Sequence, residues 1–382
     1  MMNKSAEIRS FIEHGDDSLA VRRLLDYSLE INKKDLLRQA IFISRSYHQS
    51  LKSLNSGISE FELKTQANDL LNQLDSVIPP SKVVSSPLLK VTSVAKTYDG
   101  GHFSLSPISL EIKTTDVLGV VGENGNGKTT LLRCLAGQLA IDGGAIEYSK
   151  IPEADLFEIK NHVAFIPQRI PKWHGLLKDN LHFSASLAGI YGEQNELMVD
   201  FMLERLNLTP FAHLTWDKIS SGYRTRFEIA RVLLFKPGLL ILDEPLANLD
   251  INAQQTILTD LRYLAKSTYH PLGIILSSQQ LHEVEKVADT VMFIKQGKCL
   301  FRTGEKIEEQ SVTVIELETT ISRELLVESF ESNEIQVQFN GGFYTLSSAK
   351  LNAQELIKLV LSKNIPVTYF RDITFSTKRY FN

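Results

Sequence analysis

A glycine-rich segment constrains this chain more than any other feature. Residues 122–129 read Gly-Glu-Asn-Gly-Asn-Gly-Lys-Thr and match the pattern G-x-x-x-x-G-K-[ST]. The apolar run VLGVV precedes the segment, and the helical pattern TTLLRCLAG begins at its end. Glycines in such a loop let backbone N–H groups close around phosphate oxygens, and the helix N-terminus adds a partial positive charge. The order strand, loop, helix predicts a phosphate-binding loop in an α/β domain and disfavours an ordinary glycine-rich turn.

Each residue of this loop has an expected role. Lys128 is expected to reach the β- and γ-phosphates of a nucleotide, and the Thr129 hydroxyl to bind Mg²⁺. The other residues expected to contact the nucleotide are Gly122, Glu123, Asn124, Gly125, Asn126, Gly127 and Thr130.

A carboxylate pair follows a second apolar run. Residues 239–242 read Leu-Leu-Ile-Leu, which predicts a buried strand, and Asp243 and Glu244 come directly after it. Asp243 is expected to hold Mg²⁺ through water, and Glu244 to act as the general base that polarises an attacking water. A helix cap is the alternative for an acidic pair at a strand end, but the phosphate loop favours the catalytic interpretation.

Further motifs narrow the field to one family. Residues 219–224 read Ile-Ser-Ser-Gly-Tyr-Arg and precede the helical stretch FEIARVLLF. This segment resembles the Leu-Ser-Gly-Gly-Gln signature of the ABC (ATP-binding cassette) ATPases. Gln168, in FIPQ, matches the Q-loop glutamine of that family, and Tyr98 matches the aromatic residue that stacks on adenine. Residues 247–250, which end in Asp250, resemble the D-loop. The resemblance covers residues 88–304.

The resemblance implies how the chain binds and hydrolyses ATP. Two cassettes face each other head to tail, and each ATP lies between the phosphate loop of one subunit and the signature of the other. The residues that would contact nucleotide from the signature and the D-loop are Ser220, Ser221, Gly222 and Asp250, and Gln168 would also ligate Mg²⁺. Because the chain has one phosphate loop and one signature, a complete site requires a second cassette, and we favour a homodimer.

Three positions depart from the family pattern. Ser221 replaces the first signature glycine, and Tyr223 replaces the signature glutamine. Gln279 follows the strand pattern GIILSS, where the family has a switch histidine, whereas His282 is interpreted as a residue on a helix face. Glutamine donates a hydrogen bond to a γ-phosphate but exchanges no proton at physiological pH. We interpret Gln279 as a working donor, and the alternative is a degenerate site that binds ATP without turning it over.

The pattern of elements predicts three domains. The cassette at 88–304 is expected to be an α/β P-loop domain with a largely parallel sheet and a helical subdomain. A small all-α bundle at 1–78 precedes it, and the Pro- and Ser-rich stretch 79–87 reads as a linker that implies few contacts. Residues 313–382 suggest a small α+β domain with the order strand-helix-strand-helix-strand.

Composition excludes several classes of protein. A formal net charge of -4 gives no support to non-specific nucleic-acid binding, which needs a basic surface. No apolar run approaches the roughly 20 residues that cross a bilayer, and the first residues lack an apolar signal core. The expected location is the cytoplasm, peripheral at the inner face of the cell membrane.

Cys134 and Cys299 lie among apolar neighbours and are predicted to be buried thiols.

Two functions from different classes fit these features. The favoured one is the ATPase subunit of a membrane transporter, with export through an ABC-2-like permease, because the chain has no fused membrane or substrate-binding segment. Trp173, Leu176 and Phe183 are candidates to line the groove that accepts the permease, and core packing is their alternative role.

The second function is a soluble ABC ATPase of a signalling or defence assembly. The N-terminal segment resembles small effector-associated adaptor domains in its Ile8–Gly15 start, its 44–47 stretch and its 57–59 turn. Such a domain would recruit a partner protein, and a generic helical bundle is the alternative.

Overall fold

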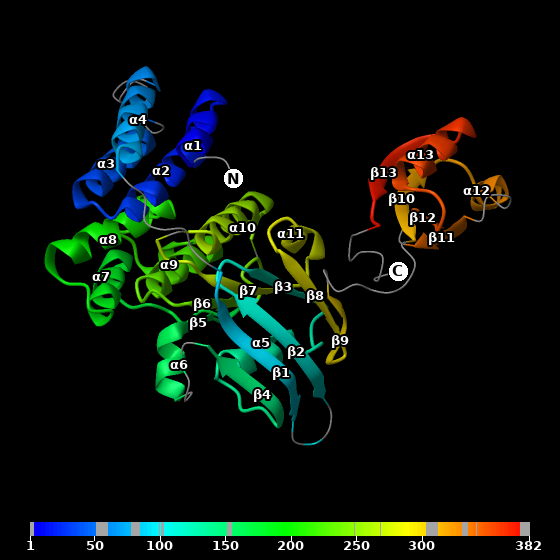
Figure 1. The fold of residues 1–382 in the computed structure, drawn as a ribbon, viewed down its shortest axis with the longest axis horizontal. Coiled ribbons are helices and arrows are strands. Elements are labelled where there is room, and N and C mark those ends of the chain that lie inside the picture. The colour runs from blue at the N-terminus through cyan, green and yellow to red at the C-terminus, as the bar shows by residue number, and fades with distance from the viewer. Residues whose placement is uncertain are drawn as a thin grey trace. The chain divides into compact units, whose positions relative to one another are not determined.

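The computed structural model divides the chain into two compact units (Figure 1). One comprises Met1–Asp289 with Ile294–Cys299, and the other Thr290–Phe293 with Leu300–Asn382. The residues that the structure describes are 4–50, 60–77, 85–98, 100, 103–149, 151, 155–247, 249–267, 269–302, 312–330, 335–340 and 342–374.

The N-terminal segment forms helices, as its apolar spacing predicts. The helices are α1 (Lys4–Glu13), α2 (Asp17–Ile31), α3 (Lys34–Ser50) and α4 (Glu60–Asp75). Leu25 of α2 and Leu71 of α4 are fully buried between the helices. The side chain of Asp16 accepts a hydrogen bond from the Leu19 amide at 3.2 Å and so caps the start of α2. The turn noted at residues 57–59 lies outside the described residues.

A six-stranded sheet forms the centre of the cassette. Its strands in spatial order are β5 (Val163–Ile166), β6 (Leu239–Leu242), β7 (Gly273–Ser278), β3 (Val117–Val121), β8 (Thr290–Lys295) and β9 (Lys298–Arg302). Neighbouring strands from β5 to β3 run parallel, which confirms the predicted parallel sheet. Every residue of β3, β6 and β7 is buried, because both faces of the sheet are covered and the strands are therefore apolar throughout.

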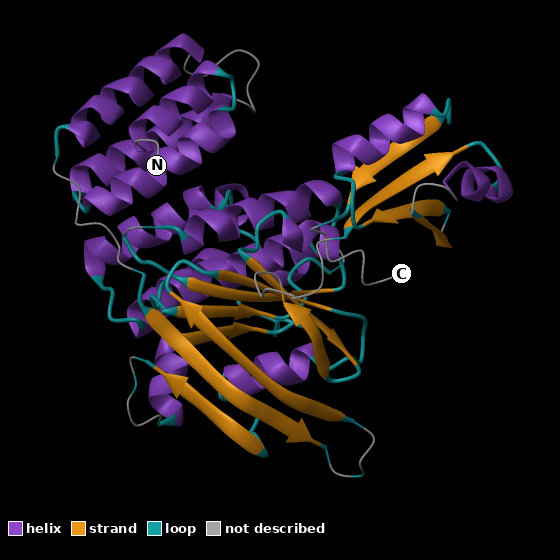
Figure 2. Ribbon diagram, turned by 45° about the vertical axis from the view of Figure 1, so that its right-hand side comes forward, coloured by secondary structure: helices purple, strands orange, loops and turns teal. Residues whose placement is uncertain are grey.

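A second, antiparallel sheet belongs to the cassette and was not predicted from the sequence. In it β1 (Pro87–Thr97) lies between β2 (Ser104–Lys113) and β4 (Gly143–Tyr148). These strands are the long arrows in the lower half of Figure 2. Exposed and buried residues largely alternate along β2, so one face packs on the core and the other faces solvent.

Helices cover the central sheet and form a helical subdomain beside it. The remaining helices of the cassette are α5 (Lys128–Leu135), α6 (Leu156–His162), α7 (Leu177–Leu187), α8 (Gly192–Arg205), η1 (Thr209–Phe211), η2 (Trp216–Lys218), α9 (Ser221–Leu233), α10 (Ile251–Ala265) and α11 (Leu281–Glu285). His282 lies on α11, as predicted. In the part of the chain that the structure describes, no helix is long and apolar enough to span a bilayer.

A buried arginine joins the bundle to the cassette. Arg205, at the end of α8, is 1% exposed. Its Nε donates to Asp26 of α2 at 2.6 Å, and its Nη1 donates to Asp260 of α10 at 2.8 Å. Arg22 of α2 donates to the same Asp260 oxygen at 2.9 Å. Burial alone would lower the pKa of the Arg205 guanidinium, but the carboxylates of Asp26 and Asp260 raise it, so the charge is retained.

A buried carboxylate makes a second junction between the bundle and α8. Glu204, also 1% exposed, accepts hydrogen bonds from Ser44 at 2.7 Å, from Arg45 at 3.2 Å and from Thr209 at 2.8 Å. Burial alone would raise the pKa of Glu204, but hydrogen bonds from His48, Ser44 and Thr209 lower it. The expectation of few contacts between bundle and cassette is therefore wrong. Residues 79–84 of the expected linker lie outside the described residues.

The C-terminal unit contains a four-stranded antiparallel sheet with two helices. Its elements are β10 (Thr313–Thr319), α12 (Arg323–Phe330), β11 (Gln336–Asn340), β12 (Phe343–Ser348), α13 (Ala353–Ser362) and β13 (Val367–Asp372). The strand order β11-β12-β10-β13 gives a β-α-β-β-α-β fold. The single strand expected between the two helices is a hairpin of β11 and β12, because Gly342, at φ 93°, turns the chain.

The two cysteines differ in exposure. Cys134 of α5 is buried, and burial raises the pKa of its thiol to about 11. Cys299 of β9 is exposed, so the prediction that both thiols are buried is wrong for Cys299. Because β9 is the edge strand of its sheet, apolar neighbours in the sequence are not enough to cover this side chain.

Candidate functional site

Four neighbouring parallel strands bring the predicted catalytic residues to one edge of the central sheet. The phosphate loop follows β3, and Asp243 and Glu244 follow β6. Gln279 follows β7, and Gln168 comes two residues after β5. Because parallel strands end at the same edge, motifs that are up to 157 residues apart (279 − 122) lie together.

The glycines of the phosphate loop are required by its geometry. Gly125 and Gly127 have φ angles of 79° and 100°, which side chains disfavour. A Cβ atom at Gly122 would lie 2.2 Å from the carbonyl oxygen of Ile294, and one at Gly127 would lie 2.6 Å from Phe103. A side chain at Gly122 would therefore displace backbone, and one at Gly127 would displace the Phe103 ring or the loop.

Asn126 fixes the loop to the turn between β8 and β9. Its side-chain oxygen accepts a hydrogen bond from the amide of Gln296 at 2.8 Å, and its carbonyl accepts one from Gly297 at 3.1 Å. Gln296 and Gly297 both have positive φ angles, 50° and 75°, as a tight two-residue hairpin requires. The Asn126 side chain thus shapes the loop rather than facing the phosphate space.

Thr129 and Asp243 place two side-chain oxygens next to each other. The Thr129 hydroxyl donates to Oδ2 of Asp243 at 2.8 Å, and Ser277 donates to the other carboxylate oxygen at 2.8 Å. Mg²⁺ in nucleotide sites takes one or two protein oxygens and completes its shell with phosphates and water. This pair fits that cation. Among the described residues, no cluster of three or more Asp, Glu, His or Cys side chains offers an all-protein cage.

Glu244 is buried and strained, and its carboxylate is ion-paired to Lys128. Its φ angle is 49°, in the left-handed region, and its amide donates to the Ser277 hydroxyl at 2.8 Å. The Lys128 ammonium lies 3.0 Å from Oε1 of Glu244 as an ion pair, and it donates hydrogen bonds to the carbonyls of Gly122 and Glu123. Apart from this ion pair, Oε1 has no hydrogen-bond partner in the described part of the chain. A Lys128 side chain drawn toward a bound phosphate would therefore leave Oε1 to accept a hydrogen bond from a water.

Ser277 is the site residue that sequence reasoning missed. It ties Asp243 to the backbone of Glu244, and it is fully buried at the end of β7. The available signal was a small polar residue closing an otherwise apolar strand, next to the strand that carries the acidic pair.

Tyr98 lies beside the first turn of α5. Its hydroxyl is 3.3 Å from the Thr130 hydroxyl, and its ring is tilted against Phe103 with 6.3 Å between centroids. The ring is 40% exposed, so a face remains open to a flat aromatic group. A base stacked there would lie next to the phosphate loop.

Gln168 and Gln279 lie at the sheet edge without touching the acidic pair. Both residues are exposed. Within the residues described, neither side chain bonds to Asp243 or Glu244. They follow β5 and β7, the two strands that flank β6 in the sheet.

The signature residues lie apart from the phosphate loop. Ser220, Gly222 and Asp250 line one groove, whose walls include no residue of the loop at 122–129. A Cβ atom at Gly222 would lie 3.3 Å from Leu249, so glycine allows the signature segment and the segment 247–250 to approach closely. Asp250 caps α10 through the Ala253 amide at 2.9 Å. Ser221 is exposed at the start of α9, and Asn248 lies outside the described residues.

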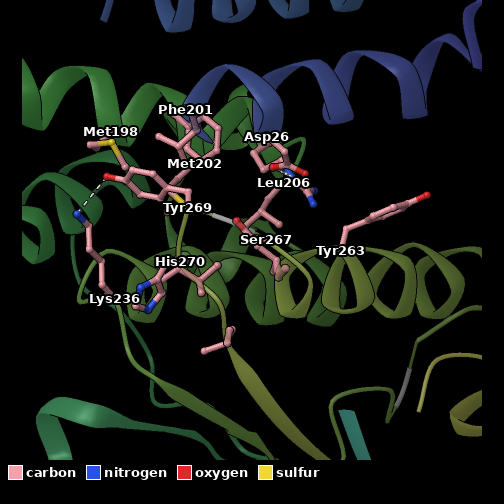
Figure 3. Close-up of a pocket in the computed structure, with 15 residues that line it drawn as sticks. Asp26, Met198, Phe201, Met202, Leu206, Lys236, Tyr263, Ser267, Tyr269 and His270 are labelled. Atoms are coloured by element: carbon pink, nitrogen blue, oxygen red, sulfur yellow. Dashed lines mark hydrogen bonds and ion pairs between the residues drawn. The ribbon is translucent and has the colours of Figure 1, made fainter. Parts of the chain in front are cut away.

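A cavity between α2, α8 and α10 is too small for a nucleotide. It has a volume of about 60 Å³, and apolar side chains such as Met198, Phe201 and Met202 line it. In Figure 3 these three side chains gather on one side, and Lys236 and Tyr269 are joined by a 3.2 Å hydrogen bond. Ligand pockets usually exceed ~300 Å³.

Comparisons with known proteins agree on one family. The profile of the family described as ABC transporter matches residues 105–247. The phosphonates import ATP-binding protein PhnC of Bdellovibrio bacteriovorus is 31% identical over 245 residues, which are 60% of this chain and 93% of that protein. This chain belongs to the ABC transporter ATPase family.

Other relatives of this ABC ATPase support the assignment. PhnC of Treponema denticola is 27% identical over 229 residues, which cover 56% of this chain and 88% of that protein. The structure of cbiO1 from Clostridium perfringens, part of the ABC transporter complex cbiONQ, matches with a TM-score of 0.51 and 25% identity. That match covers 56% of this chain and 88% of the other. The predicted ABC cassette fold and ATPase class are confirmed, and the cassette binds ATP.

Proposed function

We propose that this ABC ATPase hydrolyses Mg-ATP as a head-to-tail homodimer and drives a membrane permease. The observation that supports it best is the cluster of Lys128, Thr129, Asp243 and Glu244 at one sheet edge. Ser220 and Gly222 line a separate groove, so a nucleotide that touches both halves needs two chains.

In this proposal the side chains at the sheet edge divide the chemistry among them. Thr129 and Asp243 would hold Mg²⁺, which neutralises phosphate charge when bound. Lys128 turns from the loop carbonyls to the phosphates, which leaves Oε1 of Glu244 to orient the attacking water and take its proton. Gln279 donates to the γ-phosphate, and Tyr98 stacks on adenine.

The surface proposed to receive the permease is the outer face of α7. Phe183 and Leu187 are 65% and 63% exposed, and their i, i+4 spacing puts them on the same face of the helix. Leu176, just before α7, is 43% exposed. Trp173 is instead 9% exposed and stacks on Trp216 with 5.1 Å between ring centroids, so it is a core residue.

The direction of transport and the location stay predictions. The sequence favours export, whereas the two PhnC relatives are named import proteins. A permease partner would hold the chain at the cytoplasmic face of the membrane, which agrees with the peripheral location that the sequence favours.

The test combines turnover with recovery of the partner. We expect Glu244→Gln to retain ATP binding and to lower steady-state ATP hydrolysis by about 10²–10⁴-fold. A multi-span membrane protein should co-purify with the tagged chain from detergent-solubilised membranes.

A matched pair of variants localises the permease contact. Phe183→Ala should lose the membrane protein, whereas Phe42→Ala, which removes a 59% exposed phenylalanine from α3, should keep it. Equal recovery with both variants would contradict the contact on α7. Normal turnover in Glu244→Gln would contradict the role of the base.

A further inference from the structure

A polar groove of about 340 Å³ lies between the N-terminal bundle and the signature. The cassette lines one wall of the groove with Ser220, Gly222 and Arg226. The bundle lines the other wall with Ser18, Arg22 and His48. The volume is in the range of small-molecule sites. The bundle thus shares a site with the segment that, in the proposed function, faces nucleotide.

Docking of the bundle fixes the position of its wall. Arg22 is held by Asp260 at 2.9 Å, and His48 lies with Nδ1 3.4 Å from the buried carboxylate of Glu204. The Arg205 bridge from α8 to Asp26 anchors the same helix that carries Arg22. These contacts hold α2 and the end of α3 beside the signature.

The charges of the groove favour an anion. Arg226 is 8% exposed, and its Nε has no hydrogen-bond partner among the described residues. Ser220 precedes the 13-residue helix α9 without a side-chain cap on the described amides, so the positive end of α9 remains uncompensated. Of the acids in the wall, Asp260 is paired with Arg22 and Arg205, and Asp250 caps α10.

We propose that the bundle forms part of the half-site for the nucleotide of a second copy of this chain. Ser18 and His48 then border the triphosphate that the signature and Arg226 receive. This inference rests on the proposed homodimer. It adds that the N-terminal bundle, which lies outside the cassette, forms one wall of the nucleotide site. An intact bundle is therefore needed for the tightest ATP-dependent pairing.

Ser18 offers a clean way to test the wall. It is exposed in the first turn of α2, where an acidic residue favours the helix, so Ser18→Glu keeps the fold and adds negative charge to the groove. Ser18→Gln has the same size without the charge. Gln39→Glu adds the same charge to an exposed position of α3 outside the groove wall.

The measurement is ATP-dependent dimerisation in the Glu244→Gln background, followed by sedimentation velocity. We expect Ser18→Glu to weaken the dimer at least 10-fold, and Ser18→Gln and Gln39→Glu to stay within about 3-fold of the parent, since charge and not bulk acts in the groove. ATP affinity of the single chain should be equal in all four proteins. A Ser18→Glu dimer as tight as the parent, or tighter, would overturn the inference and leave the proposed function standing. A Glu244→Gln parent that stays monomeric with ATP would overturn both.

Discussion

Ser277 and Glu244 show how the site depends on single side chains. The Ser277 hydroxyl accepts from the Glu244 amide and donates to Asp243, so one oxygen sets the positions of both carboxylates. Glu244 has a φ angle of 49°, a conformation that costs of order 1–3 kcal/mol for a residue with a side chain. The Ser277 hydrogen bond helps to hold that strained backbone.

We therefore expect Ser277→Ala to lower kcat about 10-fold. Leaving a buried partner unsatisfied costs ~1–3 kcal/mol, and 1.4 kcal/mol corresponds to one factor of 10. Steady-state ATPase assays should show recovery in Ser277→Thr, which restores a hydroxyl. Ser184→Ala removes a buried hydroxyl from α7 and should leave kcat within 2-fold. An unchanged kcat in a folded Ser277→Ala enzyme would refute the positioning role.

The residues that the sequence predicted best belong to contiguous motifs. The loop at 122–129 and the pair Asp243–Glu244 carry their own strand and helix context, so their proximity follows from the parallel sheet. The roles of Ser277 and of the Trp173 ring come from contacts with segments 34 and 43 residues away (277 − 243 and 216 − 173). No local pattern encodes such contacts.

Helix α8 is the element that connects the parts of the first unit. Its last turn carries Glu204 and Arg205, which bond respectively to α3 and to both α2 and α10. The helix therefore links the bundle to the helical subdomain and to the cassette core. The spacing of apolar residues in the sequence does not predict this junction, because the side chains that form it are polar and buried.

Arg205→Met should lower the free energy of unfolding by about 3 kcal/mol. Removing one partner of a buried ion pair typically costs ~3–5 kcal/mol. The low end is expected here because Asp260 and Asp26 keep their ion pairs with Arg22 and Arg23, respectively. Urea titrations of the full chain measure the change. Arg133→Met replaces an exposed arginine of α5 and should stay within about 0.5 kcal/mol. A similarly small effect at Arg205 would mean that the bridge adds no net stability.

The bundle and the cassette are more interdependent than the linker between them suggests. The Pro- and Ser-rich stretch at 79–87 predicts an independent bundle, but α2 and α3 pack against α8 through buried polar groups. The α/β cassette with flanking helical and α+β parts follows from the sequence. The three domain boundaries stay predictions, and the docking of the bundle was outside the reach of pattern reasoning.

Removal of residues 1–80 should accordingly destabilise the cassette. Glu204 and Arg205 would lose their bundle partners, and ~3 kcal/mol lowers the Tm of a domain of this size by about 10 °C. Thermal unfolding of the truncated and full chains tests this, with ATP binding as the check of the fold. Arg205→Met should then cost less in the truncated chain than in the full chain. A truncated cassette with the Tm of the full chain would restore the view of an independent bundle.

The link between Asn126 and the turn at 296–297 has a consequence for how fast nucleotide is captured. Two hydrogen bonds hold the phosphate loop in shape before any ligand arrives. The loop loses its conformational entropy when the cassette folds, so nucleotide binding does not have to order it. Association of the nucleotide therefore needs no slow rearrangement of the loop. The same link makes the β8–β9 hairpin a remote determinant of affinity. Damage to that hairpin would slow nucleotide capture in a chain whose phosphate-loop sequence is intact.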